Sequence, residues 1–203
     1  EQVSFYSDPT VGLKSIIAIH STTLGPSAGG LRIYDYPSEQ DALKDVLRLS
    51  KAMSYKAAIA GIPWGGGKGI IIGNPKNKYK ELLQSYAKFV NSLNGRYITT
   101  TDVGTTEFDI ELISEITPYV VGKPSHLGGC GDMGKMTAYG VARGMEAAAI
   151  HLWGSNSLKN KTVAIQGVGK VGTALVKWLV KTYDANVIIA DINPNAILAA
   201  KAE

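Results

Sequence analysis

Two lysines and one aspartate have residue types and surroundings that suit acid–base chemistry. Lys56 ends a Met-Ser-Tyr-Lys segment. Lys68 follows three glycines at 65–67, and Asp102 follows a predicted strand. Three glycines remove the side chains beside a lysine, so a ligand could lie against that backbone. Two lysines in one pocket would disfavour each other's charge, and the pKa of one would fall by about 2–3 units. The alternative is a solvated lysine and an aspartate that caps a turn.

A second motif, near the end of the sequence, predicts a dinucleotide site. The run Gly167–Gly172 has the pattern G-x-G-x-x-G between a predicted strand and a predicted helix. Gly167 would make the tight turn, Gly169 would admit the pyrophosphate, and Gly172 would let helix and strand pack closely. The free N–H groups of the helix N-terminus would face the phosphates. The alternative is a glycine-rich turn that serves packing only.

The cofactor that this motif predicts is NAD rather than NADP. Asp191 ends the next predicted strand, where a carboxylate accepts hydrogen bonds from the ribose hydroxyls and repels a 2′-phosphate. The predicted cofactor-binding residues are Gly167, Val168, Gly169, Lys170, Val171, Gly172 and Asp191. Lys170 either touches phosphate or is a solvated helix residue.

Length and composition describe an ordinary globular chain. The 203 residues suffice for one large domain or two small ones. A hydrophobic content of 45% argues against a disordered chain, and without a run of about 20 apolar residues we expect no membrane partner. The net charge of +4 is spread along the chain, so we expect no nucleic-acid partner. The single Cys130 suits a reducing, cytoplasmic compartment, and three separated histidines predict no metal site.

Alternating strands and helices predict an α/β fold with largely parallel sheets. Strands are predicted at 3–7, 12–22, 68–73, 97–101, 119–121, 162–166 and 186–191. Helices are predicted at 38–60, 79–93, 106–115, 136–153 and 169–182, with another that starts at 194. The glycine-rich segment 25–30 is predicted to be a turn, and 124–135 a functional loop or hinge. Asp102 would then lie at the carboxyl end of a strand, where open α/β sheets place their ligands.

Seven motifs follow one another in an order that resembles a known family. They are Gly25-Pro26 with Gly29–Arg32, Met53–Lys56, Pro63–Lys68, Asn94–Tyr97, Thr101–Thr105, Thr137–Gly140 and Gln166–Gly169. In this order they resemble the glutamate/leucine/phenylalanine/valine dehydrogenase superfamily over nearly the whole chain. The leucine and phenylalanine enzymes of that superfamily are the most similar.

The resemblance implies roles for the residues singled out above. Lys56 would bind the α-carboxylate of an amino acid, Lys68 would activate the water that attacks the imine, and Asp102 would exchange protons with the substrate amino group. The other implied contacts are Gly29, Gly30 and Met53 in the substrate pocket and Thr137 near the nicotinamide carboxamide. The implied reaction passes the Cα hydride to NAD and hydrolyses the imine to a 2-oxo acid and ammonia.

The domain organisation is also implied by the resemblance. Residues 1–135 would form a mostly parallel α/β domain for substrate binding and oligomerisation. Residues 136–203 would form a linking helix and the first half of a Rossmann NAD-binding domain, and the protein would be a homo-oligomer. Half a sheet leaves an unpaired edge, so we expect the chain to be a fragment or to pair that edge with a partner.

The expected substrate is an apolar amino acid. Glutamate enzymes of the superfamily usually carry a lysine just before the paired glycines, and this chain has Ala28 there. A buried side-chain carboxylate would lack a partner at that position. Leucine, valine or isoleucine is the first choice. Phenylalanine or tryptophan is the second, because the 127–131 loop resembles the phenylalanine enzymes, whereas 137–140 resembles the leucine enzymes. A non-catalytic, truncated relative that retains an oligomerising domain is the alternative from another functional class.

Overall fold

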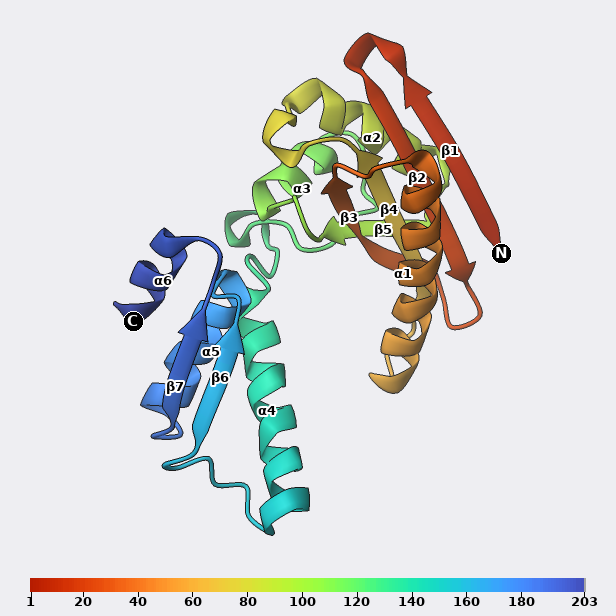
Figure 1. The fold of residues 1–203 in the computed structure, drawn as a ribbon. Helices are drawn as coiled ribbons and strands as arrows, with labels where there is room; N and C mark the ends of the chain where they lie inside the picture. The colour runs from red at the N-terminus through yellow and green to blue at the C-terminus, as the bar shows by residue number, and fades with distance from the viewer. Residues whose placement is uncertain (203) are drawn as a thin grey trace. The chain divides into compact units, whose positions relative to one another are not determined.

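The chain forms two compact units. The computed structural model describes residues 1–202 (Figure 1). The first unit runs from Glu1 to Asp132, and the second begins at Met133. Each unit has a sheet and a hydrophobic core of its own, so we describe them separately.

A five-stranded sheet is the centre of the first unit (Figure 1). Its strands are β1 (Gln2–Asp8), β2 (Leu13–Ser21), β3 (Ser27–Tyr34), β4 (Gly65–Ile72) and β5 (Tyr97–Thr101), in the order β1-β2-β4-β3-β5. Strands β4, β3 and β5 are parallel, whereas β1 and β2 pair antiparallel at one side. The predicted strand at 119–121 is reduced to a single bridge between Thr99 and Val120.

Helices cover both faces of this sheet. Helix α1 (Glu39–Ile59) buries Ala42 and Val46 against one face, and Ser38 caps its N-terminus by accepting from the backbone N–H of Asp41. Helices α2 (Lys80–Ser92) and α3 (Glu107–Ser114) pack on the opposite face, where most of the core lies. The side chains of β4 at even positions therefore face α1, and those at odd positions face the main core.

The predicted turn at 25–30 is wrong, because most of it is the central strand β3. Among the glycines of 25–30, only Gly25, with a φ of 141°, adopts a backbone conformation that favours glycine. Gly29 and Gly30 instead let neighbouring strands approach closely. A Cβ on Gly29 would lie 1.8 Å from the Gly67 carbonyl oxygen, and one on Gly30 would lie 2.4 Å from the Thr101 oxygen. Neighbouring backbone, rather than turn geometry, requires glycine here.

The three glycines before Lys68 belong to β4 and are buried against protein atoms. A Cβ on Gly65 would lie 2.0 Å from the Ser21 oxygen, and one on Gly66 would lie 2.1 Å from Ser54 Oγ. One on Gly67 would meet the ring of Tyr97 at 2.7 Å. The interpretation that a ligand lies against this backbone is therefore wrong, because other parts of the protein fill that space.

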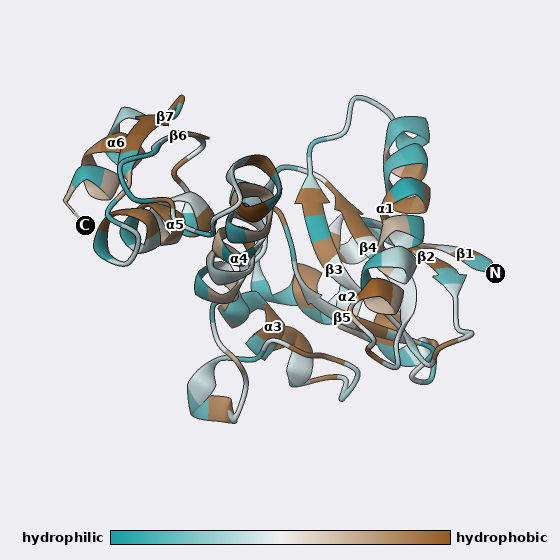
Figure 2. Ribbon diagram, turned by 90° about the horizontal axis from the view of Figure 1, so that it is seen from below, coloured by the Kyte–Doolittle hydropathy of each residue, from teal (hydrophilic) through white to brown (hydrophobic). Residues whose placement is uncertain are grey.

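The second unit contains a parallel pair of strands and three helices. They are α4 (Gly134–Trp153), β6 (Thr162–Gln166), α5 (Lys170–Lys181), β7 (Asn186–Ala190) and α6 (Pro194–Lys201). Alanines of α4 and leucines of α5 form its core with β6. Both strands are largely hydrophobic (Figure 2), and β7 leaves Ile188 61% exposed on its open face. Helix α4 begins at Gly134, within the predicted loop at 124–135.

Two glycines of the second unit provide a matched stability test. In α4 a Cβ on Gly144 would meet nothing within 4 Å, whereas in α5 one on Gly172 would lie 2.0 Å from the Gly167 oxygen. We expect Gly144→Ala to raise the free energy of unfolding by about 0.5–1 kcal/mol. Gly172→Ala is expected to lower it by about 1–3 kcal/mol. Urea denaturation measures both values, and equal effects of the two substitutions would contradict this packing.

Candidate active site

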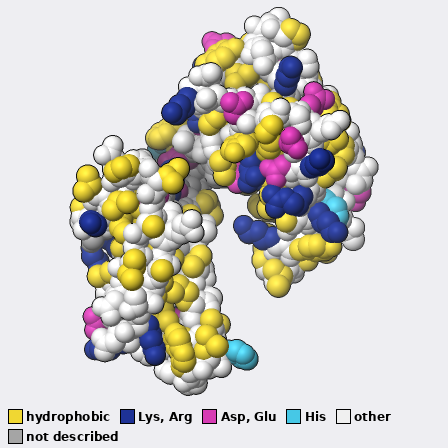
Figure 3. All heavy atoms as spheres, viewed as in Figure 1, with side chains coloured by type: hydrophobic (Ala, Val, Ile, Leu, Met, Phe, Trp, Pro, Cys, Tyr) yellow, Lys and Arg dark blue, Asp and Glu magenta, His cyan; other side chains and the backbone are white. Residues whose placement is uncertain are grey.

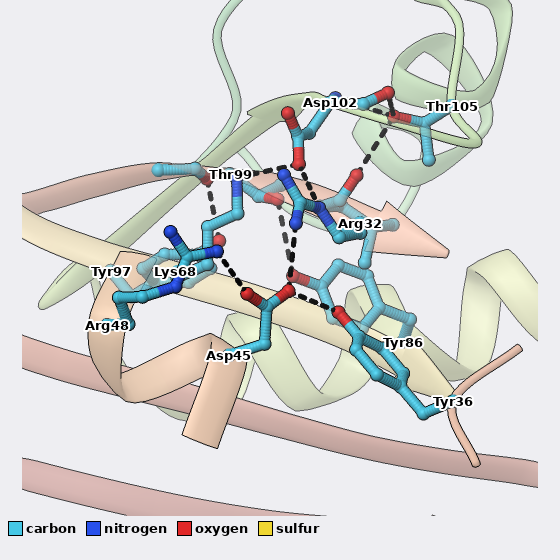
Figure 4. A network of polar contacts seen from close by, with 12 residues as sticks. Arg32, Tyr36, Asp45, Arg48, Lys68, Tyr86, Tyr97, Thr99, Asp102 and Thr105 are labelled. Carbon is cyan, nitrogen blue, oxygen red and sulfur yellow. Dashed lines mark hydrogen bonds and ion pairs between the residues drawn. The ribbon is translucent and has the colours of Figure 1, made fainter. Parts of the chain in front are cut away.

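Lys68 is a buried charge in the middle of β4. Only 4% of its surface is exposed, and its side chain lies on the face of the sheet that α1 covers. Its Nζ lies 2.9 Å from Oδ2 of Asp102, which immediately follows β5 (Figure 4). A buried ammonium is tolerated only with such a partner. The structure thus brings together two of the three residues predicted to do chemistry.

Asp102 is held by several groups at once. Arg32 of β3 donates from Nε to the same Oδ2 at 2.8 Å. The Asp102 backbone N–H donates to Thr105 Oγ1 at 2.8 Å, and Thr105 in turn donates to the Leu31 carbonyl. Gly30 lies next to the Asp102 side chain: a Cβ on Gly30 would be 2.7 Å from Asp102 Cβ. Gly30 therefore leaves room for the aspartate itself.

Three more residues extend this network to α1 (Figure 4). Arg32 Nη1 donates to Asp45 Oδ2 at 2.8 Å, and Tyr36 donates to the same oxygen at 2.7 Å. Arg48 donates to the other oxygen of Asp45 at 2.6 Å. Neither Arg32 nor Asp45 is among the predicted site residues. The signal for Arg32 was a charge inside an otherwise apolar strand, as for Lys68.

The network sets the charge state of its members. Burial lowers the pKa of Lys68, the ion pair with Asp102 opposes this, and the charge of Arg32 lowers it further. Burial raises the pKa of Asp102, but Lys68 and Arg32 outweigh burial and hold that pKa below its usual range. The pKa of Lys68 is shifted in the predicted direction, but the main cause is burial rather than a second lysine.

The predicted substrate residues lie around this network in different ways. Lys56 is in the last turn of α1 and exposed, on a helix where several Lys and Arg side chains gather (Figure 3). Within residues 1–202 no ion pair joins it to Asp102. The carbonyl of Gly29 accepts a hydrogen bond from the buried Tyr97 hydroxyl at 2.6 Å. Met53 is half-buried in α1.

The glycine motif forms the turn between β6 and α5. Gly167 turns the chain with a φ of 93°, and nothing lies within 4 Å of a Cβ on Gly169. Helix α5 begins at Lys170 without a side-chain cap at its N-terminus. Asp191 accepts from the Val168 N–H at 2.8 Å and from the Asn193 N–H at 2.8 Å, and these bonds lower its pKa.

Thr137 lies exposed in the first turns of α4, in the same unit as the glycine motif. Across residues 1–202, no group of three or more His, Cys, Asp or Glu side chains could hold a metal ion. No helix in the same range is long and apolar enough to cross a membrane.

Two family models match most of the chain. Residues 2–119 match the family described as Glu/Leu/Phe/Val dehydrogenase, dimerisation domain, and residues 128–198 match Glutamate/Leucine/Phenylalanine/Valine dehydrogenase. Phenylalanine dehydrogenase of Caldalkalibacillus thermarum is 49% identical over 97% of this chain and 53% of its own. Leucine dehydrogenase of Geobacillus stearothermophilus is 48% identical over 100% of this chain and 55% of its own.

A solved structure shows the same fold. L-tryptophan dehydrogenase from Nostoc punctiforme superposes with a TM-score of 0.71 at 45% identity, over 100% of this chain and 56% of that one. The chain thus spans about half the length of the relatives that it matches. The predicted family and fold class are confirmed, and the chain belongs to the glutamate/leucine/phenylalanine/valine dehydrogenase family.

Proposed function

We propose that the protein containing this chain catalyses the NAD-dependent oxidative deamination of an apolar L-amino acid. Leucine, valine or isoleucine would be converted to its 2-oxo acid and ammonia. The observation that carries the proposal is the ion pair between the buried Lys68 and the partly exposed Asp102 at the carboxyl end of β5, in a chain of this dehydrogenase family. Such a pair supplies a tuned base and a proton acceptor beside each other.

Each residue of the pair has a distinct role in the proposed reaction. Lys68 draws a proton from the water that attacks the imine carbon, and its lowered pKa favours the neutral amine that this step needs. Asp102 stays ionised and exchanges a proton with the substrate amino group. Lys56 pairs with the α-carboxylate, for which an exposed ammonium on α1 is suited.

The second unit fits NAD. The open space beside Gly169 and the uncapped start of α5 suit a pyrophosphate. Residues 167–172 would hold the phosphates, Asp191 the ribose hydroxyls, and Thr137 the carboxamide. When bound, NAD accepts the hydride from Cα. The preference for NAD over NADP rests on the ionised Asp191, which would repel a 2′-phosphate.

The preference for an apolar substrate rests on Ala28. This residue is 2% exposed in β3, immediately before Gly29 and Gly30, and offers no cation to a side-chain carboxylate. Phenylalanine or tryptophan is the second candidate, favoured by the names of relatives at 49% and 45% identity.

A substrate panel tests the proposed function. We expect the full-length protein with NAD to produce NADH, followed by absorbance, with leucine, valine or isoleucine and not with glutamate. Preferred turnover of phenylalanine or tryptophan would favour the second substrate class. NADH production with glutamate alone would contradict the apolar assignment, and no turnover with any amino acid would favour a non-catalytic relative.

The same panel, measured with the 203-residue chain, shows whether these residues suffice for turnover.

We propose in addition a cytoplasmic homo-oligomer, since the match at 2–119 is to a family described as a dimerisation domain. Light scattering after gel filtration measures the subunit number, and a monomer would contradict the assembly.

A further inference from the structure

Arg32 bridges two carboxylates that come from different elements. From the middle of β3 its side chain, 20% exposed, donates from Nε to Asp102 and from Nη1 to Asp45 (Figure 4). Both distances are 2.8 Å. A planar guanidinium can make two such bonds in fixed directions, whereas a lysine ammonium is a single point charge.

The α1 end of this bridge is itself fixed. Asp45 accepts hydrogen bonds from Tyr36 and Arg48 as well as from Arg32, so its two oxygens accept three hydrogen bonds. Its side chain is 16% exposed. The guanidinium is therefore anchored to a rigid helix rather than to solvent.

At the other end, both cations bind the same oxygen of Asp102. Lys68 and Arg32 both contact Oδ2, and the contacts of the Asp102 carboxylate drawn in Figure 4 go to this oxygen. The carboxylate, 25% exposed, thus keeps one oxygen for a proton from a ligand. Its backbone is held separately through Thr105.

We propose that Arg32 is a positioning residue for the deamination. It orients Asp102 so that Oδ1 faces the substrate amino group, and it shares the Asp102 carboxylate with Lys68. The inference rests on the proposed function. Asp45 acts through Arg32 by holding the guanidinium in place.

The charges around Lys68 determine the sign of the expected effect. Asp102 faces it from the segment after β5, Arg32 from β3, and Asp45 from α1, while its partner on β2 is the apolar Ala18. The positive charge of Arg32 repels the Lys68 ammonium, and Arg32 also binds the Asp102 carboxylate that neutralises Lys68. Removing Arg32 would therefore raise the pKa of Lys68 and leave less neutral amine at a given pH.

The test uses full-length Arg32→Met, Arg32→Lys and Asp45→Asn, with Arg96→Met as control. Arg96 is an exposed arginine whose ion pair is with Glu1, and within residues 1–202 no ion pair joins it to Lys68, Asp45 or Asp102. Two quantities are measured in each variant. One is the pH dependence of kcat/KM, and the other is the pH dependence of Lys68 acetylation by trace acetic anhydride, read by mass spectrometry.

We expect distinct results from the variants. Arg32→Met moves the rising limb of the pH profile and the Lys68 labelling curve upward by about one pH unit. Arg32→Lys keeps the charge, so both curves stay near their native positions while kcat falls about 10- to 100-fold through misplacement of Asp102. Asp45→Asn lowers kcat without removing Arg32, and Arg96→Met changes neither curve.

The labelling arm separates this inference from the proposed function. Acetylation of Lys68 can be measured without turnover. A protein that is inactive with every amino acid would refute the proposed function, and the pH dependence of Lys68 acetylation could still be measured in it. An unchanged Lys68 curve in Arg32→Met, or native kcat in Arg32→Lys, would overturn the inference. If Arg32→Met does not fold, Arg32→Lys and Asp45→Asn decide it, since native kcat in both would refute a positioning role.

Discussion

Replacing Lys68 with alanine is expected to lower turnover of the full-length protein by about 100- to 10,000-fold, the usual contribution of a general base. The substitution removes the amine that lies 2.9 Å from Asp102 and leaves Asp102 paired with Arg32. The fold should persist, because no buried charge loses its only partner. NAD binding should also persist, since residues 167–172 belong to the other unit. Steady-state kinetics and NAD titration by calorimetry measure the two properties.

Lys44→Ala is the matched control for this substitution. Its side chain is 78% exposed on α1, and its nearest carboxylate lies 4.0 Å away. We expect near-native turnover from this variant. Undiminished turnover in Lys68→Ala would refute the assignment of Lys68 as the base. Loss of NAD binding in the same variant would contradict the separation of the two functions.

Replacing Asp102 with asparagine is expected to damage both activity and stability. The amide cannot exchange protons, so turnover should fall about 100- to 10,000-fold. Lys68 and Arg32 lose the anion that both contact, which should lower the free energy of unfolding by about 2–3 kcal/mol, less than for a fully buried pair. The pKa of Lys68 should fall further, opposite to the effect of Arg32→Met, because the attraction of Asp102 is gone.

The acid side of the stability curve provides a second measurement on this variant. Because the folded pKa of Asp102 is lowered, its contribution is fully present above the unfolded value of about 3.9 and is lost as pH falls through the folded value. The native protein should therefore lose more stability below that pH than Asp102→Asn does. Asp35→Asn, at an exposed position next to β3, is the control. Equal acid sensitivity of the native protein and Asp102→Asn would contradict this linkage.

Much of the fold follows from local patterns. Strand β2, helix α1 and the strand–turn–helix around Gly167 all lie where they were predicted. These features depend on neighbours within a few residues, where side-chain period, capping and turn chemistry act directly. Strand β3 was missed for the complementary reason. Its glycines are required by other strands of the sheet, so a local reading mistakes them for a turn.

The sequence by itself determined the family and indicated Lys68, Asp102 and the glycine motif as candidate site residues, because these depend on residue types at short spacing. Tertiary structure decided how the site is assembled. Arg32 and Asp102 lie 70 residues apart, and they meet because β3 pairs with β5, while α1 brings Asp45 to the same face. That order of strands is set by packing between distant segments. The same packing, with α1 over this face of the sheet, buries Lys68, and that burial lowers its pKa.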